Sequence, residues 1–265
     1  MSGMFDMTGK VVAITGGAGN LGKAMTRTLL DAGANVAVIG RTDRLGDGFV
    51  GDGDSGRMAF LAFDLASDGG AKGAMAAAAE RFGGIDVLVN NAAYGGGAGG
   101  KSCEFRLDLI DDETWNTGID GTLGIAFRCT REAIPHLERR GGGAIVNIGS
   151  MYGLVSPDFA IYGNDVPWSP PSYGAGKAGV LQLTRYCAAA LAPKNIRVNS
   201  LTPGPFPNVT PHSDMEFVGR LSGKTMLRRT GRPEELAGAL LLLCSDASSY
   251  MTGANIVVDG GMTAW

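Results

Sequence analysis

Residues 11–22 read VVAITGGAGNLG, and this stretch decides the fold that the sequence predicts. The β-branched run 11–15 predicts a buried strand, and the pattern from about Leu21 to Ala32 predicts a helix. Between them, residues 17–22 satisfy the spacing Gly-x-Gly-x-x-Gly. In a turn that joins a strand to a helix, this spacing lets the backbone approach a pyrophosphate, whose charge then lies at the positive helix N-terminus. The stretch predicts a dinucleotide-binding turn, against the plainer alternative of an ordinary glycine-rich turn.

The same alternation of short apolar runs and helical patterns continues along the chain. Strands are predicted at 11–15, 35–39, 58–63, 85–90, 143–148, 196–201 and 255–259. Helices are predicted at 21–32, 68–82, 111–140 (as one helix or two), 173–192 and 233–245. The Gly- and Asp-rich residues 42–57 predict a loop with at most one helical turn. Because wholly apolar strands are typical of parallel sheets buried on both faces, we predict a single Rossmann-like, doubly wound α/β domain over residues 1–265, with a seven-stranded parallel sheet flanked by helices.

The composition narrows the classes of function. The 265 residues are 45% hydrophobic, which allows a large core, and the net charge of −3 without a basic block disfavours nucleic acid as a partner. Four scattered cysteines without a Cys-x-x-Cys pair, and the isolated His136 and His212, indicate neither a disulfide framework nor a metal site. No apolar run reaches the roughly 18 residues of a membrane span, and the N-terminus lacks a secretory-signal pattern. We expect a cytoplasmic protein with no membrane or metal partner.

Five further motifs follow the glycine turn in order. They are Asp-Leu at 64–65, Asn-Asn-Ala-Ala at 90–93, Ile-Gly-Ser at 148–150, Tyr-Gly-Ala-Gly-Lys at 173–177 and Pro-Gly-Pro at 203–205. Together with the C-terminal stretch 245–261, they resemble the short-chain dehydrogenase/reductase family over nearly the whole chain. Asn20 stands where the family has its middle glycine, and Ala93 replaces another glycine. Asparagine is the non-glycine residue that best tolerates positive φ, so we expect the turn to accept Asn20.

The spacing of Tyr173 and Lys177 places both side chains on one face of the predicted helix. A neighbouring ammonium favours the phenolate, so we predict that Lys177 lowers the pKa of Tyr173 and makes it a general acid or base. Ser150 is predicted to bind the substrate oxygen, and the resemblance implies that Lys177 also contacts the nicotinamide ribose. The family's fourth residue is an Asn that helps hold a proton-relay water. Thr122 stands there in this sequence, and its hydroxyl could keep only part of that role.

The end of the second predicted strand indicates the cofactor. Gly40 ends the strand and Arg41 follows it. The strand end therefore offers no carboxylate to bind a ribose 2′-hydroxyl, whereas the Arg41 guanidinium can pair with a 2′-phosphate. Asp43 could still serve NAD(H), but we favour NADP(H). The cofactor-binding residues predicted from the motifs and the resemblance are Gly16, Gly17, Gly19, Asn20, Leu21, Gly22, Arg41, Thr42, Asp64, Leu65, Asn91, Ala92, Tyr173, Lys177, Pro203, Gly204 and Phe206.

The substrate side is set by residues 151–172, which form a longer stretch between the predicted catalytic Ser and Tyr than the family usually has. The segment resembles a branch of the family that acts on sugar-like or polyol substrates. Candidate substrate contacts are Tyr152, Tyr162, Trp168 and, beyond the segment, Asn208. The segment could instead be a subunit contact or a lid.

These features favour an NADP(H)-dependent oxidoreductase that interconverts a ketone and a secondary alcohol on a small polar, sugar-like, polyol or cyclic molecule. A 3-oxoacyl thioester reductase is an alternative, for which the basic cluster of Arg228, Arg229 and Arg232 would bind the carrier. A dinucleotide-binding regulatory protein with a decayed site is a non-enzyme alternative. The resemblance also implies a homotetramer.

Overall fold

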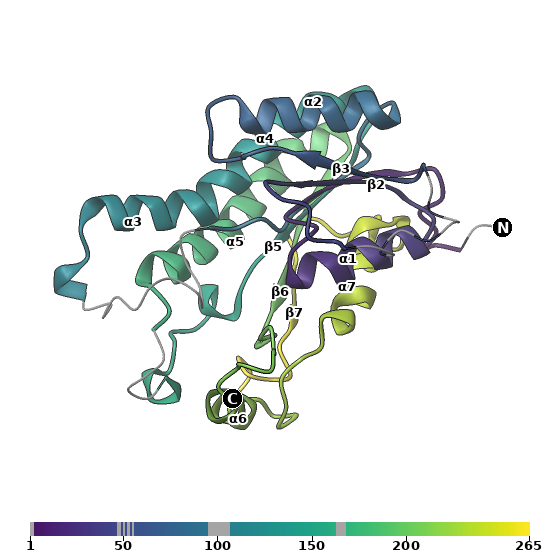
Figure 1. Ribbon diagram of the computed structural model, residues 1–265. Coiled ribbons are helices and arrows are strands. Elements are labelled where there is room, and N and C mark those ends of the chain that lie inside the picture. The colour runs from purple at the N-terminus through teal and green to yellow at the C-terminus, as the bar shows by residue number, and fades with distance from the viewer. Residues whose placement is uncertain are drawn as a thin grey trace.

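The computed structural model describes residues 3–46, 49, 51, 54, 56–94, 107–162 and 168–265. Within these residues, all strands form one seven-stranded parallel sheet in the order β3-β2-β1-β4-β5-β6-β7 (Figure 1). The strands are β1 Val11–Thr15, β2 Asn35–Gly40, β3 Met58–Ala62, β4 Val87–Asn90, β5 Gly143–Ile148, β6 Ile196–Pro203 and β7 Asn255–Val258. The strand order reverses between β1 and β4, which is the place where open parallel sheets form a ligand-binding crevice.

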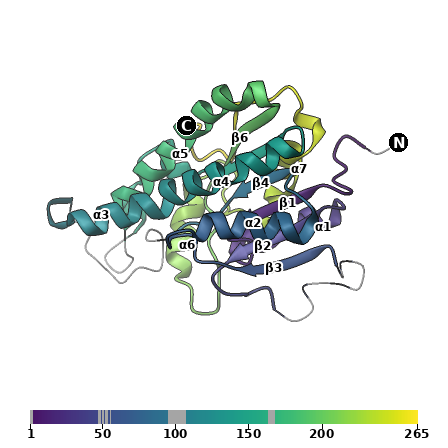
Figure 2. The ribbon, with the colours of Figure 1, turned by 90° about the horizontal axis from the view of Figure 1, so that it is seen from above.

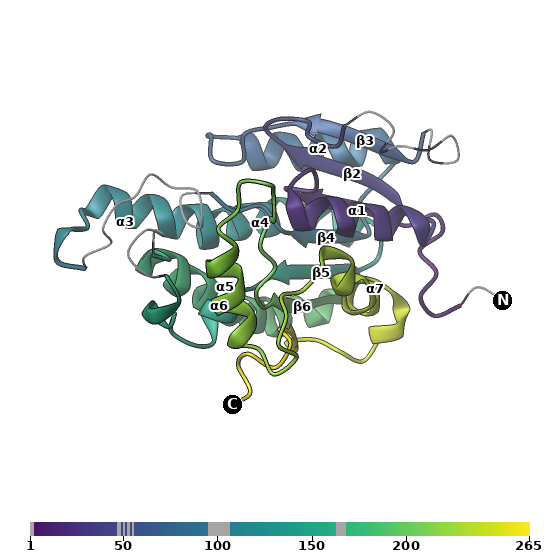
Figure 3. The same cartoon turned by 60° about the horizontal axis from the view of Figure 1, so that its bottom comes forward.

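Helices cover both faces of the sheet. They are α1 Asn20–Asp31, α2 Gly70–Phe82, α3 Asp112–Ile119, α4 Ile125–Arg139, α5 Pro171–Leu191, α6 Met215–Gly223 and α7 Ala237–Cys244. Helices α1 and α7 pack on one face, which is turned toward the viewer in Figure 3, and α2, α4 and α5 pack on the other. Figure 2 shows α4 continuing in nearly the same direction as α3 beside α5. The predicted α/β class and doubly wound sheet are confirmed.

The burial of β1 explains why its sequence is apolar without interruption. All five of its residues are buried. Val12 and Ile14 point into the hydrophobic cluster beneath α1 and α7, whereas Ala13 points into the cluster beneath α2, α4 and α5. Because successive side chains of a strand point to opposite faces, a strand covered on both sides must be apolar at every position.

The region 111–140, predicted as one helix or two, forms the two helices α3 and α4, joined by a π-helical segment at Asp120–Gly124 that was not predicted. Helix α6 was not predicted, because Gly219 and Gly223 weaken the helical pattern. Its signal was Asp214, whose carboxylate accepts hydrogen bonds from two backbone N–H groups of the first turn.

The π-helical segment attaches the end of the β4 strand to the long helices. The carbonyl of Gly121 accepts a hydrogen bond from the backbone N–H of Tyr94 (3.0 Å). A Cβ atom at position 121 would lie 2.1 Å from the Tyr94 carbonyl oxygen. Glycine is therefore required for this close approach, since no real Cβ contact is so short.

Replacing Gly121 with alanine is expected to destabilise the protein. Overpacking of this kind typically costs about 1–3 kcal/mol in the free energy of unfolding. Gly219→Ala is the matched control, because its new methyl group would meet no atom within 4 Å and alanine favours the helix. Thermal unfolding should show a lowered Tm only for Gly121→Ala, and equal Tm values for the two variants would contradict this account.

Candidate active site

The glycine turn joins β1 to α1 by a close approach of backbone to backbone. Gly16 has a φ of +64°, which favours glycine. A Cβ atom at Gly22 would lie 2.1 Å from the Gly16 carbonyl oxygen, so the first turn of α1 can pack onto the loop only with glycine there. Asn20 is the first residue of α1 and does not have positive φ, so its predicted tolerance of that conformation is not the reason it fits. The turn retains the shape needed to receive a pyrophosphate at the helix N-terminus.

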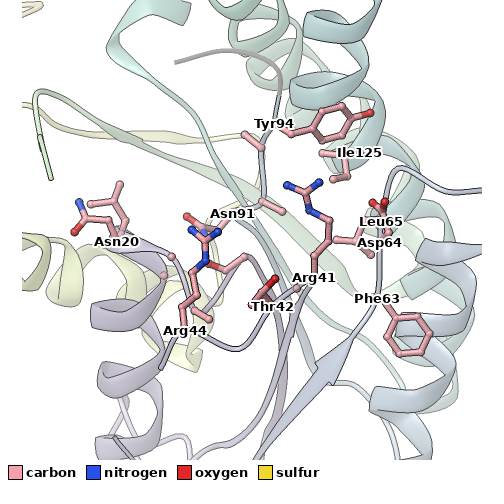
Figure 4. Close-up of a pocket in the computed structure, with 18 residues that line it drawn as sticks. Asn20, Arg41, Thr42, Arg44, Phe63, Asp64, Leu65, Asn91, Tyr94 and Ile125 are labelled. Carbon is pink, nitrogen blue, oxygen red and sulfur yellow. The ribbon is translucent and has the colours of Figure 1, made fainter. Parts of the chain in front are cut away.

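A hollow of about 550 Å³ opens beside this turn, at the carboxyl ends of β1, β2 and β4 (Figure 4). The predicted cofactor residues that line it are Gly16, Gly19, Asn20, Leu21, Gly22, Arg41, Thr42, Asp64, Leu65, Asn91 and Ala92. Gly17 lies behind the hollow, where a Cβ would meet Ile14 and Thr26 at 2.9 Å. Arg44 and Tyr94 also line the hollow and were not predicted. Arg44 could have been found from its charge and its place three residues after Arg41.

Hydrogen bonds fix the two strands that border the hollow. The Thr15 hydroxyl accepts the backbone N–H groups of Asn91 and Ala92, each at 3.0 Å. In return, the Asn91 side-chain amide donates to the carbonyl oxygens of Thr15 (3.1 Å) and Gly16 (2.9 Å). These bonds join the end of β1 to the residues that follow β4, where the strand order reverses. They therefore hold the glycine turn and the Asn-Asn-Ala-Ala motif in a fixed position along one side of the hollow.

Two arginines supply the positive charge at the end of β2. The side chains of Arg41 and Arg44 both extend into the hollow (Figure 4). Asp43 does not face it, because its carboxylate accepts a hydrogen bond from the backbone N–H of Leu45 (2.9 Å). The lining thus presents guanidinium groups where an NAD-specific site would present a carboxylate.

The three predicted catalytic residues come together at the carboxyl end of β5. Ser150 follows this strand and is buried, and its Oγ accepts the backbone N–H of Tyr152 at 3.2 Å. Ser150 also hydrogen-bonds Tyr173 on α5. One helical turn later, the Lys177 Nζ lies 5.8 Å from the centre of the Tyr173 ring and donates to the Ile148 carbonyl at 2.7 Å.

Burial, rather than mutual attraction, sets the pKa values of this pair. Burial lowers the pKa of the Lys177 ammonium from 10.5 to about 8. Burial also raises the pKa of the Tyr173 phenol above its ordinary value, and the hydrogen bond with Ser150 offsets only part of that rise. The predicted lowering of the Tyr173 pKa by Lys177 is therefore wrong for this structure, because the Lys177 Nζ is directed to the Ile148 carbonyl.

A chain of buried amides and hydroxyls holds α5 behind the catalytic residues. The Asn90 amide donates to Asn147 (2.8 Å) and to Thr130 on α4 (3.0 Å). The Asn147 amide donates to Thr184 on α5 (2.9 Å). Because unsatisfied buried polar groups are costly, these bonds fix α4 and α5 relative to the sheet, and with them the helix that carries Tyr173.

Thr122 lies at the position of the family's Asn but turns its hydroxyl elsewhere. Its Oγ1 donates to the carbonyl oxygens of Gly118 (2.9 Å) and Ile119 (3.2 Å) in its own helix. The side chain is buried against Gly176, where a Cβ would lie 1.8 Å from the same oxygen. The expectation that this hydroxyl serves a proton relay is therefore not supported, since its proton is already bonded within the helix.

The other predicted cofactor residues lie at the end of β6. Pro203 ends this strand, and the Gly204 backbone N–H donates to the Val258 carbonyl (2.9 Å). The ring of Phe206 packs against Gly231, where a Cβ would lie 2.3 Å away. These residues border the same edge of the sheet as the glycine turn but do not line the 550 Å³ hollow.

The predicted substrate contacts fall into two groups. The hydroxyl of Tyr162 donates to that of Tyr152 at 3.0 Å, and Tyr152 adjoins Ser150. Trp168 stacks on Phe159 with ring centres 4.6 Å apart, in a second hollow of about 460 Å³ that Tyr152 also lines but Ser150 and Tyr173 do not. Asn208 is exposed on the segment after β6.

Helix α6 and the 151–172 segment are joined through a small core of their own. Ile161 and Tyr162 pack with Phe217 and Leu221 of α6. An ion pair between Asp158 and Lys224 (2.5 Å) and a hydrogen bond from Arg220 to the Ile161 carbonyl (2.6 Å) add to this contact. The two segments therefore form one unit beside the catalytic residues.

The remaining features of the described residues concern metal ligands, cysteines and membrane-spanning helices. No group of three or more His, Cys, Asp or Glu side chains within them is placed to hold a metal ion. Cys129, Cys187 and Cys244 are buried free thiols, and Cys103 lies outside the described residues. None of the helices in the described part of the chain has the length and apolar character of a membrane span.

The buried Lys177 predicts how stability depends on pH. The folded protein has lost the Lys177 proton above about pH 8, whereas the unfolded chain keeps it up to about pH 10.5. Because the unfolded state then binds more protons, the free energy of unfolding should rise with pH across this window. Urea unfolding of wild type and Lys177→Met from pH 7 to 10.5 should show a relative gain for the wild type. A constant difference between the two proteins would contradict the lowered pKa.

Comparisons with known proteins agree with this geometry. The family model described as Enoyl-(Acyl carrier protein) reductase matches residues 16–263. The chain is 33% identical to the 3-oxoacyl-[acyl-carrier-protein] reductase FabG of Thermotoga maritima, over 97% of this chain and 98% of that protein. It is also 33% identical to the cis-4-hydroxycyclohexanecarboxylate dehydrogenase of Sinomonas cyclohexanicum, over 96% and 97%.

Solved structures show the same fold with either nicotinamide cofactor. The short chain dehydrogenase of Leptospira borgpetersenii with bound NAD+ superimposes with a TM-score of 0.83 and 28% identity, covering 97% of this chain and 94% of that one. The RhlG/NADP complex of Pseudomonas aeruginosa gives 0.84 and 29%, covering 99% and 100%. This chain therefore belongs to the short-chain dehydrogenase/reductase family and is an enzyme that acts on CH–OH or C=O groups.

Proposed function

We propose that the protein is an NADP(H)-dependent oxidoreductase that interconverts a ketone and a secondary alcohol on a small polar cyclic or sugar-like molecule. The observation that carries this proposal is the placement of Ser150, Tyr173 and Lys177 together at the sheet edge that bears the glycine turn. The backbone approach of Gly22 to Gly16 fits a dinucleotide pyrophosphate, because a Cβ would fill that space. The nicotinamide, when bound, supplies or accepts the hydride.

Ser150 and Tyr173 handle the oxygen of the substrate in this proposal. The Ser150 hydroxyl hydrogen-bonds Tyr173 in this structure, and in the proposal its proton passes from that bond to the substrate carbonyl, where it stabilises the charge that develops. Burial raises the pKa of Tyr173, so its phenol stays protonated near neutral pH and can act as general acid in reduction. In alcohol oxidation, the same oxygen takes the proton back as general base.

Replacing Tyr173 with phenylalanine should abolish most of the activity. General acid–base catalysis contributes about 10²- to 10⁴-fold, so kcat should fall by that factor while the Kd for NADPH stays unchanged. Tyr250→Phe, at a fully exposed position, is the matched control and should keep full activity. Unchanged turnover in Tyr173→Phe would overturn the proposed catalytic role.

Arg41 and Arg44 support the preference for NADP(H). Each guanidinium can pair with a 2′-phosphate by charge-assisted hydrogen bonds, and neither has a competing carboxylate in the hollow at the end of β2. Asp64, the acidic residue among the described lining, follows β3 and not β2.

Arg41→Ala and Arg44→Ala should each raise the KM for NADPH at least about tenfold, as expected for the loss of a hydrogen bond to a charged group. The KM for NADH should change less than about twofold, since NADH has no 2′-phosphate for the arginines to bind. Arg185→Ala on the exposed surface of α5 is the control. Similar kcat/KM values for NADPH and NADH in the wild type would contradict the preference.

The 3-oxoacyl thioester alternative is favoured by the similarity to FabG but not by the basic cluster. Arg229 and Arg232 both pair with Glu235 (2.6 and 3.5 Å), and the Arg228 guanidinium lies over the Trp265 ring at 5.0 Å. A carrier phosphate would have to compete with these partners. Acetoacetyl-CoA, tested in the same assay as cyclic and sugar-like ketones, distinguishes the two candidates.

We also propose that the enzyme is a homotetramer. The exposed aromatic side chains of Trp115, Phe127 and Tyr186 on α3, α4 and α5 support an association through the long helices.

The intact Ser150, Tyr173 and Lys177 group argues against the regulatory alternative with a decayed site.

A further inference from the structure

The hydroxyls of Tyr152 and Tyr162 meet, and the backbone of Tyr152 contacts Ser150. Tyr162 is buried and held in place by the Phe217 ring, whose centre lies 5.7 Å away. Its hydroxyl donates to the hydroxyl of Tyr152 at 3.0 Å. Neither contact belongs to the family's Ser-Tyr-Lys group, and Tyr162 comes from the segment that is longer in this chain.

The direction of this hydrogen bond is fixed from outside the pair. Ser169 donates to the Tyr162 oxygen from its backbone N–H and from its hydroxyl. Because a phenol has one proton, Tyr162 gives that proton to Tyr152. The Tyr152 oxygen is thus an acceptor within the chain, and its own O–H has no acceptor among the residues that the structure describes.

The Tyr152 residue lies against the catalytic group. Its backbone N–H donates to Ser150 Oγ (3.2 Å), and its carbonyl oxygen lies 3.0 Å from the point where a Cβ would stand on Gly174, the neighbour of Tyr173. Burial is the main cause that raises the pKa of Tyr152, Tyr162 raises it next, and the charge of an ionised Tyr173 adds to the rise. The Tyr152 proton is therefore retained across the working pH range.

We propose that the Ser169–Tyr162–Tyr152 chain is a second substrate-binding element, in which the Tyr152 hydroxyl donates a hydrogen bond to a second oxygen carried next to the reacting carbon. The inference rests on the proposed function and specifies its substrate class: a vicinal diol, or the corresponding α-hydroxy ketone, rather than an isolated alcohol. Consecutive hydrogen bonds polarise one another, so the chain strengthens Tyr152 as a donor. The Tyr152 backbone contacts Ser150 and the charge of an ionised Tyr173 acts on the Tyr152 phenol, and on this basis the proposal has two neighbouring substrate oxygens bound at once.

The test compares two probes that differ by one hydroxyl, cyclohexanol and cis-cyclohexane-1,2-diol, in NADP+-dependent oxidation. Wild type should prefer the diol in kcat/KM. Tyr152→Phe should raise the KM for the diol about 3- to 10-fold, as expected for one neutral hydrogen bond, while kcat/KM for cyclohexanol stays within about twofold. Tyr162→Phe should cause a smaller loss of the same kind, because Tyr152 remains but is no longer polarised.

Tyr250→Phe, at a fully exposed position, is the matched control, and the Tm and the Kd for NADPH of each variant report on folding. A merely structural role of Tyr152 would lower kcat/KM equally for both alcohols, and that result overturns the inference. An unchanged preference for the diol in both variants also overturns it, as does a wild type that oxidises cyclohexanol without preferring the diol. A wild type that oxidises neither alcohol but reduces acetoacetyl-CoA instead overturns the proposed function, and the inference with it.

Discussion

The carbonyl oxygen of Gly16 is the point on which the cofactor end of the molecule depends. It accepts the Gly19 N–H within the turn (3.0 Å) and the side-chain amide of Asn91, the residue after β4 (2.9 Å), and the first turn of α1 packs onto it at Gly22. One oxygen therefore joins the turn, the helix and the neighbouring strand. Because this close packing leaves no room for a Cβ at Gly22, the glycine requirement follows from the fold as well as from any ligand.

The catalytic group depends on burial in a similar way. Lys177 is held beside Tyr173 by the Ile148 carbonyl, at a place where water is excluded and the ammonium is costly. The same exclusion of water keeps Tyr173 protonated. The site thus holds a neutral acid and a readily deprotonated amine side by side, a state suited to giving a proton to a carbonyl oxygen. The buried Asn147–Thr184 bond keeps α5 in the register that brings them together.

The segment after Ser150 and α6 form a unit of their own beside Ser150 and Tyr173. Their shared core around Ile161 and Leu221 is separate from the main hydrophobic clusters, so it can vary without altering the sheet. Through Tyr162 it reaches the catalytic side by a hydrogen bond to Tyr152. A segment that the family resemblance alone leaves open, as lid, subunit contact or substrate wall, thereby acquires a defined contact with the reacting region.

The sequence by itself determined the sheet, the glycine turn and the grouping of Ser150, Tyr173 and Lys177. These features follow from short-range regularities: a two-residue alternation or an apolar run for strands, a four-residue spacing for one helix face, and glycine where backbones touch. For the same reason, the missed helix α6 had a local signal in Asp214.

Only the tertiary structure decided how the side chains are used. In the folded protein the Lys177 ammonium donates to the Ile148 carbonyl, and the Thr122 hydroxyl donates to a carbonyl one helical turn earlier. Arg44 lines the hollow together with Arg41. It also paired Tyr162 with Tyr152. Burial and hydrogen-bond partners come from segments that are distant along the chain, so no local pattern contains them, and they set the pKa values and the polarity that the chemistry requires.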